Sequence, residues 1–334
     1  MKQILVIRRD NIGDLVCTTP FFTALRKRFP DAWIGAFVNS YNAPVLDRNP
    51  DLNEVISYTK LKHLGAQRGA LGALKKRLTM LWRLRRMKLD CVVLATSDFV
   101  PRLARLARLL APQEVVGFSD GSRRARVLDR AVEIGSVAYM HEVERVFALT
   151  ELFGIEGEIP PPTVIPEPVE VQKAKAIIAG SGLKVAIHIS ARRPAQRWPV
   201  ERFVTFINRI SKAHGATVML LWSPGAVDHP QHPGDDAKAR QISDKAPDVV
   251  AYRTERLAEL IGALAACDAV ICSDGGASHI AAALGKATLC FFGDSPVERW
   301  RPWGVKHQVL QPASRKVADI TVDEATGAFA ALLK

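Results

Sequence analysis

The stretch VICSDGGASHIAAALGKATLCFFGDSPVERWRPWG, residues 270–304, decides how this chain folds. An apolar run over residues 268–272 predicts a buried parallel strand. A polar turn with two glycines follows, then a helix over 279–284, and then a second apolar run over 287–292. A buried strand, a turn, a helix and another buried strand form the repeating unit of a doubly wound parallel sheet.

The turn at residues 273–276 places a carboxylate and two glycines directly before that helix. Ligands of doubly wound proteins bind outside the carboxyl ends of the strands, where helix N-termini attract anions. The sequence therefore predicts a phosphate site at the backbone N–H groups of residues 276–279, with the glycines allowing close approach. The alternative is a plain strand–helix turn in which Asp274 only caps the helix.

Apolar strands and amphipathic helices alternate along both halves of the 334-residue chain, which is long enough to form two cores. Between the halves lies GIEGEIPPPTVIPEP, residues 154–168. Three consecutive prolines cannot continue a helix or a central strand, so we interpret this segment as a linker. The sequence predicts an α/β protein with two parallel-sheet domains, residues 1–160 and 161–334.

The net charge of +12 comes from one region, because residues 60–130 contain 17 Lys and Arg against 5 Asp and Glu. A basic surface there indicates an anionic partner, such as nucleic acid, a phosphorylated glycolipid or a membrane, or else a solvated face that aids solubility. Two basic amphipathic helices are predicted in it, over 69–88 and 100–110. The first either packs on its own domain or lies on an anionic membrane. Its apolar face is expected to comprise Leu71, Leu74, Leu78, Leu81 and Trp82.

Several function classes lack their motifs in this chain. It has no GxGxxG after the first strand, no P-loop, no DxD pair, no HExxH and no GxSxG. We therefore expect a reaction that needs neither a metal nor a covalent serine. The five cysteines lack CxxC spacing, and Cys91, Cys272 and Cys290 fall in apolar runs, as buried thiols of a reducing cytoplasm do. No secretory signal and no apolar run near the ~20 residues of a membrane span are recognised.

Three polar segments follow predicted strands. In residues 11–14, Asp14 opens a helix and is either a general base or a capping residue. In SARRPAQRW, residues 190–198, three arginines suit a diphosphate, because guanidinium groups bind phosphate oxygens in pairs. The third segment is the glycine turn. Two phosphate-binding segments in one domain and a carboxylate in the other predict a cleft where a donor and an acceptor meet.

Three segments, in this order, carry a family resemblance: NIGDLVCTTPFFTALRKRFPDA at 11–32, SDGGASHIAAALGKATLCFFGDSP at 273–296, and ERWRPWG at 298–304. Together they resemble glycosyltransferase family nine, whose best-known members are the ADP-heptose:lipopolysaccharide heptosyltransferases. The resemblance implies a GT-B fold, with two Rossmann-like domains facing across a cleft. The first domain would bind the acceptor and the second the nucleotide-sugar donor, while a final helix over 322–333 would pack back on the first.

The resemblance also implies roles for single residues. Asp14 would be the catalytic base. Donor binding is expected of Arg192, Arg193, Gln196, Arg197, Asp236, Thr254, Asp274, Gly275, Gly276, Ser278 and His279. Acceptor binding is expected of Asn11, Gly13, Ser97, Asp98, Arg123 and Arg124. Two positions depart from the family pattern, because Gly275 stands where threonine is usual and Gln196 where lysine is common. One of the three arginines of residues 190–198 would then supply the missing charge.

The function implied is an inverting glycosyltransferase that moves heptose from ADP-heptose to the inner core of lipopolysaccharide by a single displacement. Its only co-substrate would be the nucleotide sugar, without a metal. The expected partners are this donor, an anionic glycolipid acceptor and the inner face of the cytoplasmic membrane, on which a cytoplasmic monomer would work. The alternatives are transfer of another nucleotide-activated sugar, a GT-B-like nucleotide-sugar epimerase, and a nucleic-acid-binding protein. The last is disfavoured because the basic helices contain few interleaved aromatics and the glycine turn would have no role.

Overall fold

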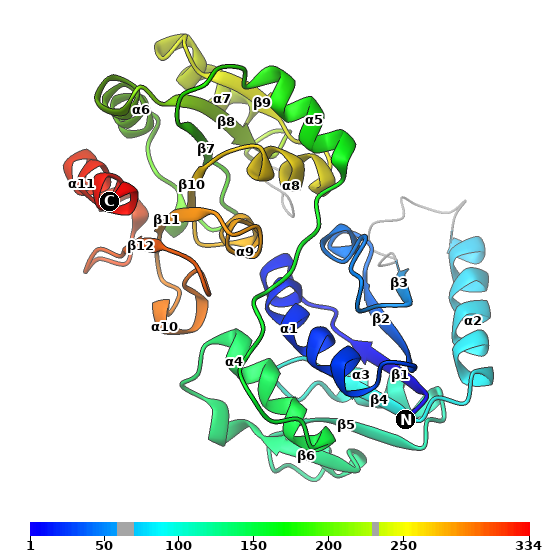
Figure 1. Ribbon diagram of the computed structural model, residues 1–334. Helices are drawn as coiled ribbons and strands as arrows, with labels where there is room; N and C mark the ends of the chain where they lie inside the picture. Colours follow the sequence, from blue (N-terminus) through cyan, green and yellow to red (C-terminus); the bar gives the residue numbers. More distant parts are fainter. Residues whose placement is uncertain (59–69, 229–233) are drawn as a thin grey trace. The chain divides into compact units, whose positions relative to one another are not determined.

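The computed structural model describes residues 1–58, 70–228 and 234–334 (Figure 1). Contacts within the chain divide it into two compact units, Met1–Thr163 and Val164–Lys334. The predicted boundary between residues 160 and 161 lies in the same proline-rich segment. That segment is shorter than predicted, because helix α5 (Pro168–Ile177) already begins at Pro168. Proline suits the first helical turn, where its missing N–H would have no partner.

In the first unit the described strands form a six-stranded parallel sheet in the order β3-β2-β1-β4-β5-β6. The strands are β1 (Gln3–Ile7), β2 (Trp33–Asn39), β3 (Glu54–Tyr58), β4 (Cys91–Leu94), β5 (Glu114–Ser119) and β6 (Arg130–Glu133). The α-helices are α1 (Ile12–Arg28), α2 (Ala70–Arg86), α3 (Pro101–Leu109) and α4 (Glu142–Phe147). The sequence did not predict β6, because its charged ends and two apolar residues give too short a pattern.

Helices α2 and α3 cover one face of this sheet, where Leu84, Leu103 and Leu106 pack against strand residues such as Leu5 and Val92. The predicted inward face of α2 is wrong in part. Leu78 and Trp82 are each 58% exposed, whereas Leu84 is fully buried. At 3.6 residues per turn, Leu81 and Met80 share the side of Leu84 and are partly buried with it. Gly69 and the side chains of Leu71 and Leu74 lie outside the described residues.

The second unit repeats the same architecture, with a six-stranded parallel sheet in the order β12-β11-β10-β7-β8-β9 among the described residues. Its strands are β7 (Lys184–His188), β8 (Thr217–Trp222), β9 (Val250–Arg253), β10 (Ala269–Ser273), β11 (Ala287–Phe291) and β12 (His307–Leu310). Besides α5, the α-helices are α6 (Val200–His214), α7 (Asp236–Lys245), α8 (Leu257–Ala265), α9 (Gly276–Ala283), α10 (Val297–Trp300) and α11 (Val322–Leu333). The half-buried edge strand β12 was not predicted, since it begins with two polar residues and contains only two apolar ones.

In both sheets the chain winds outward from a central pair of strands, β1 and β4 in the first unit and β7 and β10 in the second. At this switch point the loops after the two strands diverge and leave a crevice for a ligand. The three segments singled out in the sequence follow strands of these pairs: residues 11–14 after β1 in the first unit, and 190–198 after β7 and 273–276 at the end of β10 in the second. The strand order therefore places them at the two ligand-binding positions of a doubly wound protein.

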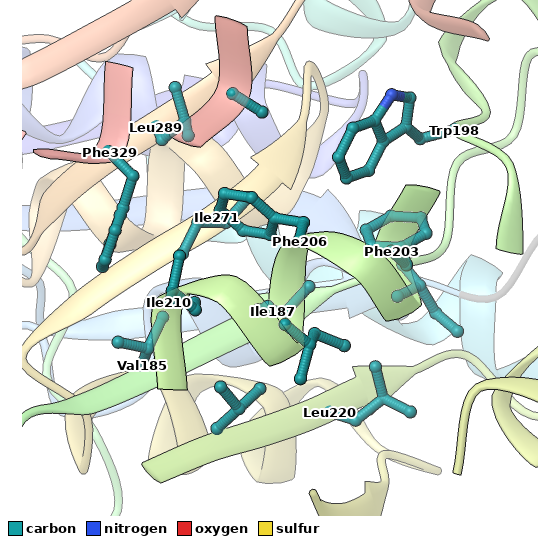
Figure 2. Packing of buried hydrophobic residues seen from close by; sticks show 14 of the residues in the cluster. Val185, Ile187, Trp198, Phe203, Phe206, Ile210, Leu220, Ile271, Leu289 and Phe329 are labelled. Atoms are coloured by element: carbon teal, nitrogen blue, oxygen red, sulfur yellow. The ribbon is translucent and has the colours of Figure 1, made fainter. Parts of the chain in front are cut away.

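An aromatic core on one face of the second sheet fixes the segment 190–198 (Figure 2). Trp198, 1% exposed, has its ring centroid 4.9 Å from those of Phe203 and Phe291. Its Nε1 donates a hydrogen bond to the carbonyl of Ile320 at 2.9 Å. The last residue of the arginine-rich segment is thus held inside the core.

Helix α11 completes the same core, because its Phe329 and Leu332 are buried in it. It packs against α6, β11 and β12 of its own unit. That it also reaches the first unit stays a prediction.

All five cysteines are buried and form no disulfide, so the buried thiols expected at Cys91, Cys272 and Cys290 are confirmed. In the described part of the chain, none of the helices is both long and apolar enough to cross a membrane.

We predict that Trp198→Ala lowers the free energy of unfolding by about 3–5 kcal/mol, because it opens a cavity and removes a buried hydrogen bond. Urea unfolding followed by circular dichroism measures the change. Trp82→Ala is the matched control: the same substitution at a largely exposed position should cost less than ~1 kcal/mol. Equal losses for both variants would contradict the anchoring role of Trp198.

Candidate active site

Asp14 is the third residue of α1 and lies at the switch point of the first sheet. Its Oδ2 accepts hydrogen bonds from the backbone N–H and the side-chain Nδ2 of Asn11, at 3.1 and 3.0 Å. Its Oδ1 accepts one from Nη2 of Arg8 at 2.8 Å. The carboxylate, 13% exposed, therefore caps the helix and is also held by a cation. The two readings that the sequence left open for Asp14 are compatible.

The cation is a fully buried guanidinium at the end of β1. Arg8 is 0% exposed, and its Nη2 also donates to Oε1 of Glu142 at 2.7 Å, while its Nε lies 3.0 Å from Oδ2 of Asp10. Although burial opposes the charge, Glu142, Asp14 and Asp10 together raise the pKa of Arg8 above its usual value. Burial raises the pKa of Asp10, with further upward contributions from neighbouring carboxylates, against the effect of Arg8.

Sequence reasoning missed Arg8, Asp10 and Glu142 as site residues. Glu142 begins α4 and reaches the cluster from far along the chain, and no motif links it to Arg8. The sequence did contain one signal for Arg8. It is a charged residue directly after the apolar strand β1, and ligands of parallel sheets bind at this end of a strand.

The expected acceptor residues are spread over the carboxyl edge of the first sheet. Ser97 is buried after β4 and donates its hydroxyl to Oε1 of Glu142 at 2.7 Å, so it joins the Asp14 cluster. Asp98 follows it and is exposed, and Gly13 is buried in the first turn of α1. Arg123 and Arg124 are exposed after β5, a strand that β4 separates from β1. Their roles towards an acceptor stay predictions.

In the second unit a hydrogen bond joins the two predicted phosphate-binding segments. Gln196 donates from Nε2 to Oδ2 of Asp274 at 2.9 Å, and Ser273 donates its hydroxyl to the Gln196 carbonyl at 2.6 Å. Burial raises the pKa of Asp274, while hydrogen bonds from Ser295 and Gln196 and the charge of Arg193 oppose this rise. Where the family commonly has a lysine, this chain therefore holds Asp274 with a neutral amide.

The three arginines of residues 190–198 are used differently. Arg197 pairs with the buried Asp235 at 3.1 Å and donates to the Ala191 carbonyl at 2.9 Å, so it braces the loop. Arg193 is half exposed and lies 3.3 Å from Asp294, which is also half exposed. Arg192 is exposed. Of the three, Arg192 and Arg193 are the side chains best placed to turn towards a ligand.

Helix α9 begins at Gly276, earlier than the predicted start at His279. The Ser278 hydroxyl donates to the Gly275 carbonyl at 2.8 Å, and the side chains of Ser278 and His279 are buried. The backbone N–H of Ser278 also donates to the Gly275 carbonyl at 3.2 Å, so the N–H groups of Gly276 and Ala277 are the ones that this helix start presents to an anion. Gly275 has extended backbone, and a Cβ there would come no closer than 4.0 Å to its nearest neighbour. A Cβ at this position, where the resemblance leads us to expect threonine, would therefore fit without a clash.

Two further residues expected to bind the donor, Asp236 and Thr254, are tied to the loop after β8. Asp236 accepts hydrogen bonds from Nε1 of Trp222 at 2.8 Å and from the N–H of Gly225 at 3.0 Å, and these bonds lower its pKa. Thr254 donates its hydroxyl to the Trp222 carbonyl at 2.8 Å. Both residues hold the fold at this point, and their roles towards a nucleotide stay predictions.

A comparison with known proteins decides the family. Residues 77–324 match the model of Glycosyltransferase family 9 (heptosyltransferase), which is well over half of the chain. This chain belongs to glycosyltransferase family 9. Of the functions that the sequence left open, membership of the family selects glycosyl transfer.

Relatives within glycosyltransferase family 9 are distant but cover the chain almost fully. Lipopolysaccharide heptosyltransferase 3 of Escherichia coli K12 is 26% identical over 295 residues, which cover 87% of this chain and 82% of the relative. The structure of the family 9 protein of Veillonella parvula superposes with a TM-score of 0.83 at 16% identity, covering 99% and 97% of the two chains. An E. coli heptosyltransferase with ADP-2-deoxy-2-fluoro heptose gives 0.77 at 18% identity, covering 98% and 99%. The GT-B fold class predicted from the sequence is confirmed.

His188, the last residue of β7, provides a pH dependence next to this site. Its Nε2 is buried without a hydrogen-bond partner among the described residues. Burial, with a smaller contribution from the charge of Lys238, lowers the pKa of His188 from 6.5 to about 4. The unfolded chain protonates His188 more readily than the folded protein does. The folded state is therefore favoured fully above pH 6.5, and this contribution of His188 to the free energy of unfolding is lost as the pH falls towards 4.

We therefore predict that the free energy of unfolding falls between pH 6.5 and pH 4 by up to about 3 kcal/mol more in the wild type than in His188→Gln. The amide of the variant cannot take up a proton in this range. Urea unfolding of both proteins at half-unit pH steps measures the difference. Parallel pH curves would show that His188 titrates normally in the folded protein.

Proposed function

We propose that this protein is an inverting heptosyltransferase that transfers heptose from ADP-heptose to the inner core of lipopolysaccharide. The observation that carries the proposal is the held carboxylate Asp14 at the switch point of the first sheet, in a chain of glycosyltransferase family 9. Relatives support the choice of sugar and acceptor, because one is a lipopolysaccharide heptosyltransferase and another was solved with an ADP-heptose analogue.

In the proposed reaction the first unit holds the acceptor and the second the donor. An acceptor hydroxyl oxygen attacks the anomeric carbon, the bond from that carbon to the ADP oxygen breaks, and Asp14 takes the hydroxyl proton. General base catalysis of this kind contributes typically ~10²–10⁴-fold. The bonds from Arg8 and Asn11 fix the carboxylate in one orientation, which is the condition for such a contribution.

The departing ADP carries the negative charge that develops in this step. The first N–H groups of α9 and the guanidinium of Arg193 are proposed to bind its diphosphate, as helix N-termini and arginines bind phosphate elsewhere. Asp274 and Gln196 then position the turn. No metal is part of this proposal.

We predict that Asp14→Asn lowers kcat by at least about 100-fold, because an amide cannot accept the proton. Release of ADP from ADP-heptose in the presence of a lipopolysaccharide core acceptor measures turnover. The control is calorimetric binding of ADP, whose Kd should stay within about 2-fold of the wild type. Turnover near that of the wild type in a folded Asp14→Asn protein would rule out the assignment.

We further propose that the protein is a cytoplasmic monomer that contacts the inner face of the cytoplasmic membrane through α2. Lys75, Leu78, Trp82 and Arg86 lie on one side of this helix and are all exposed, and the Arg86 guanidinium lies 4.5 Å from the Trp82 ring centroid. Neighbouring Arg83 pairs with Glu54, and Arg85 donates to the Leu109 carbonyl. A stripe of apolar and basic side chains suits the headgroup region of an anionic bilayer.

We predict that the double variant Trp82→Ser/Arg86→Glu binds vesicles containing phosphatidylglycerol at least about 5-fold more weakly than the wild type. Co-sedimentation with vesicles at low and high salt measures binding, and vesicles of neutral lipid define the background. Lys212→Glu, an exposed charge change on α6, is the control and should bind like the wild type. Equal binding by both variants would contradict the proposed surface.

A further inference from the structure

Arg8 follows strand β1, and its guanidinium is fully buried, which is a costly place for a charged group. Moving a cation out of water costs several kcal/mol unless it is paired and fully hydrogen bonded. One carboxylate would balance the charge, yet Asp14, Glu142 and Asp10 all lie within 3.0 Å of this group, and its Nη1 donates to the Ala95 carbonyl. The cluster therefore holds more negative charge than the fold needs to bury Arg8.

The hydrogen bonds show how the cluster is organised. A single nitrogen, Nη2 of Arg8, donates both to Oε1 of Glu142 at 2.7 Å and to Oδ1 of Asp14 at 2.8 Å. Because this nitrogen carries two hydrogens in the guanidinium plane, the direction of one bond sets the direction of the other. Glu142 thus determines where Arg8 meets Asp14.

Glu142 is itself held in place from two sides. It is 0% exposed, and the Ser97 hydroxyl donates to its Oε1 at 2.7 Å. One turn further along α4, Arg145 donates from Nη2 to the Ser97 carbonyl at 3.1 Å. Helix α4 and the loop after β4 are therefore locked together around the carboxylate of Glu142.

We propose that Glu142, acting through Arg8, is a positioning residue that holds Asp14 in the orientation needed to take the acceptor proton. This inference rests on the proposed role of Asp14 as the base. In the reaction the proton passes from the acceptor oxygen to the carboxylate of Asp14, which becomes neutral. Arg8 then keeps Glu142 as its charged partner, so the buried guanidinium is paired before and after the transfer.

The test measures kcat, both KM values and the melting temperature of Glu142→Gln in the full-length protein. Glutamine keeps the length of the side chain and removes the negative charge that Glu142 presents to Arg8. We expect kcat to fall at least 10-fold, with both KM values and the Kd for ADP within about 2-fold of the wild type. Glu142→Asp, which restores the charge, should recover part of the lost kcat.

Val146→Ala is the matched control, because this residue is buried one turn further along the same helix and has no polar group. It should lower the melting temperature while leaving kcat within 2-fold. If Glu142→Gln does not fold, Ser97→Ala replaces it: loss of one bond to Glu142 should lower kcat by a smaller factor, with the KM for the donor and the Kd for ADP within about 2-fold of the wild type. A folded Glu142→Gln or Ser97→Ala protein with the wild-type kcat overturns the proposal.

A double-mutant cycle separates this inference from the proposed function. If Glu142 acts through Asp14, adding Glu142→Gln to Asp14→Asn should lower kcat no further. Normal turnover of Asp14→Asn would overturn the base assignment and with it this inference. An inactive Asp14→Asn beside a normal Glu142→Gln would overturn the positioning role alone, and multiplied losses in the double variant would show that Glu142 acts independently of Asp14.

Discussion

The charge of Arg8 in a water-free position is the constraint around which the first unit is arranged. Strand β1 delivers this side chain to the switch point of its sheet, and carboxylates from the β1–α1 loop, from α1 and from α4 converge on it. A buried guanidinium without these partners would cost several kcal/mol. The same bonds that balance the charge also fix the one carboxylate, Asp14, that the proposed chemistry needs.

The switch point of the second unit is built on a different principle. There the connection between the two loops is a neutral amide, Gln196, on a buried carboxylate, Asp274, and the segment is anchored by the aromatic core around Trp198. Apolar packing, hydrogen bonds and the Arg197–Asp235 pair hold this frame, while Arg193 stays half exposed, as the proposed contact with an anionic donor requires.

Family 9 membership shows that this chain is a glycosyltransferase. The departures of this chain from the family pattern are local and tolerated by its fold. A Cβ at Gly275 would come no closer than 4.0 Å to another atom. Gln196, at the position where a lysine is expected, donates a hydrogen bond to Asp274. The structure therefore shows how the turn at residues 273–276 is held with Gly275 and Gln196 at the two positions where the resemblance leads us to expect threonine and lysine.

The sequence alone determined the alternation of strands and helices, the proline-rich boundary, and the polar segments that contain Asp14 and Asp274, because these follow from local periodicity and turn chemistry. It missed β6 and β12, whose short edge sequences carry little apolar pattern. It also placed Leu78 and Trp82 wrongly on the inward face of α2, since a helix with leucines on several sides does not show which of them meets the sheet. Only the tertiary structure decided that Arg8, Ser97 and Glu142 meet at Asp14. These residues lie far apart in the chain, and the strand order that joins them depends on packing across the whole sheet.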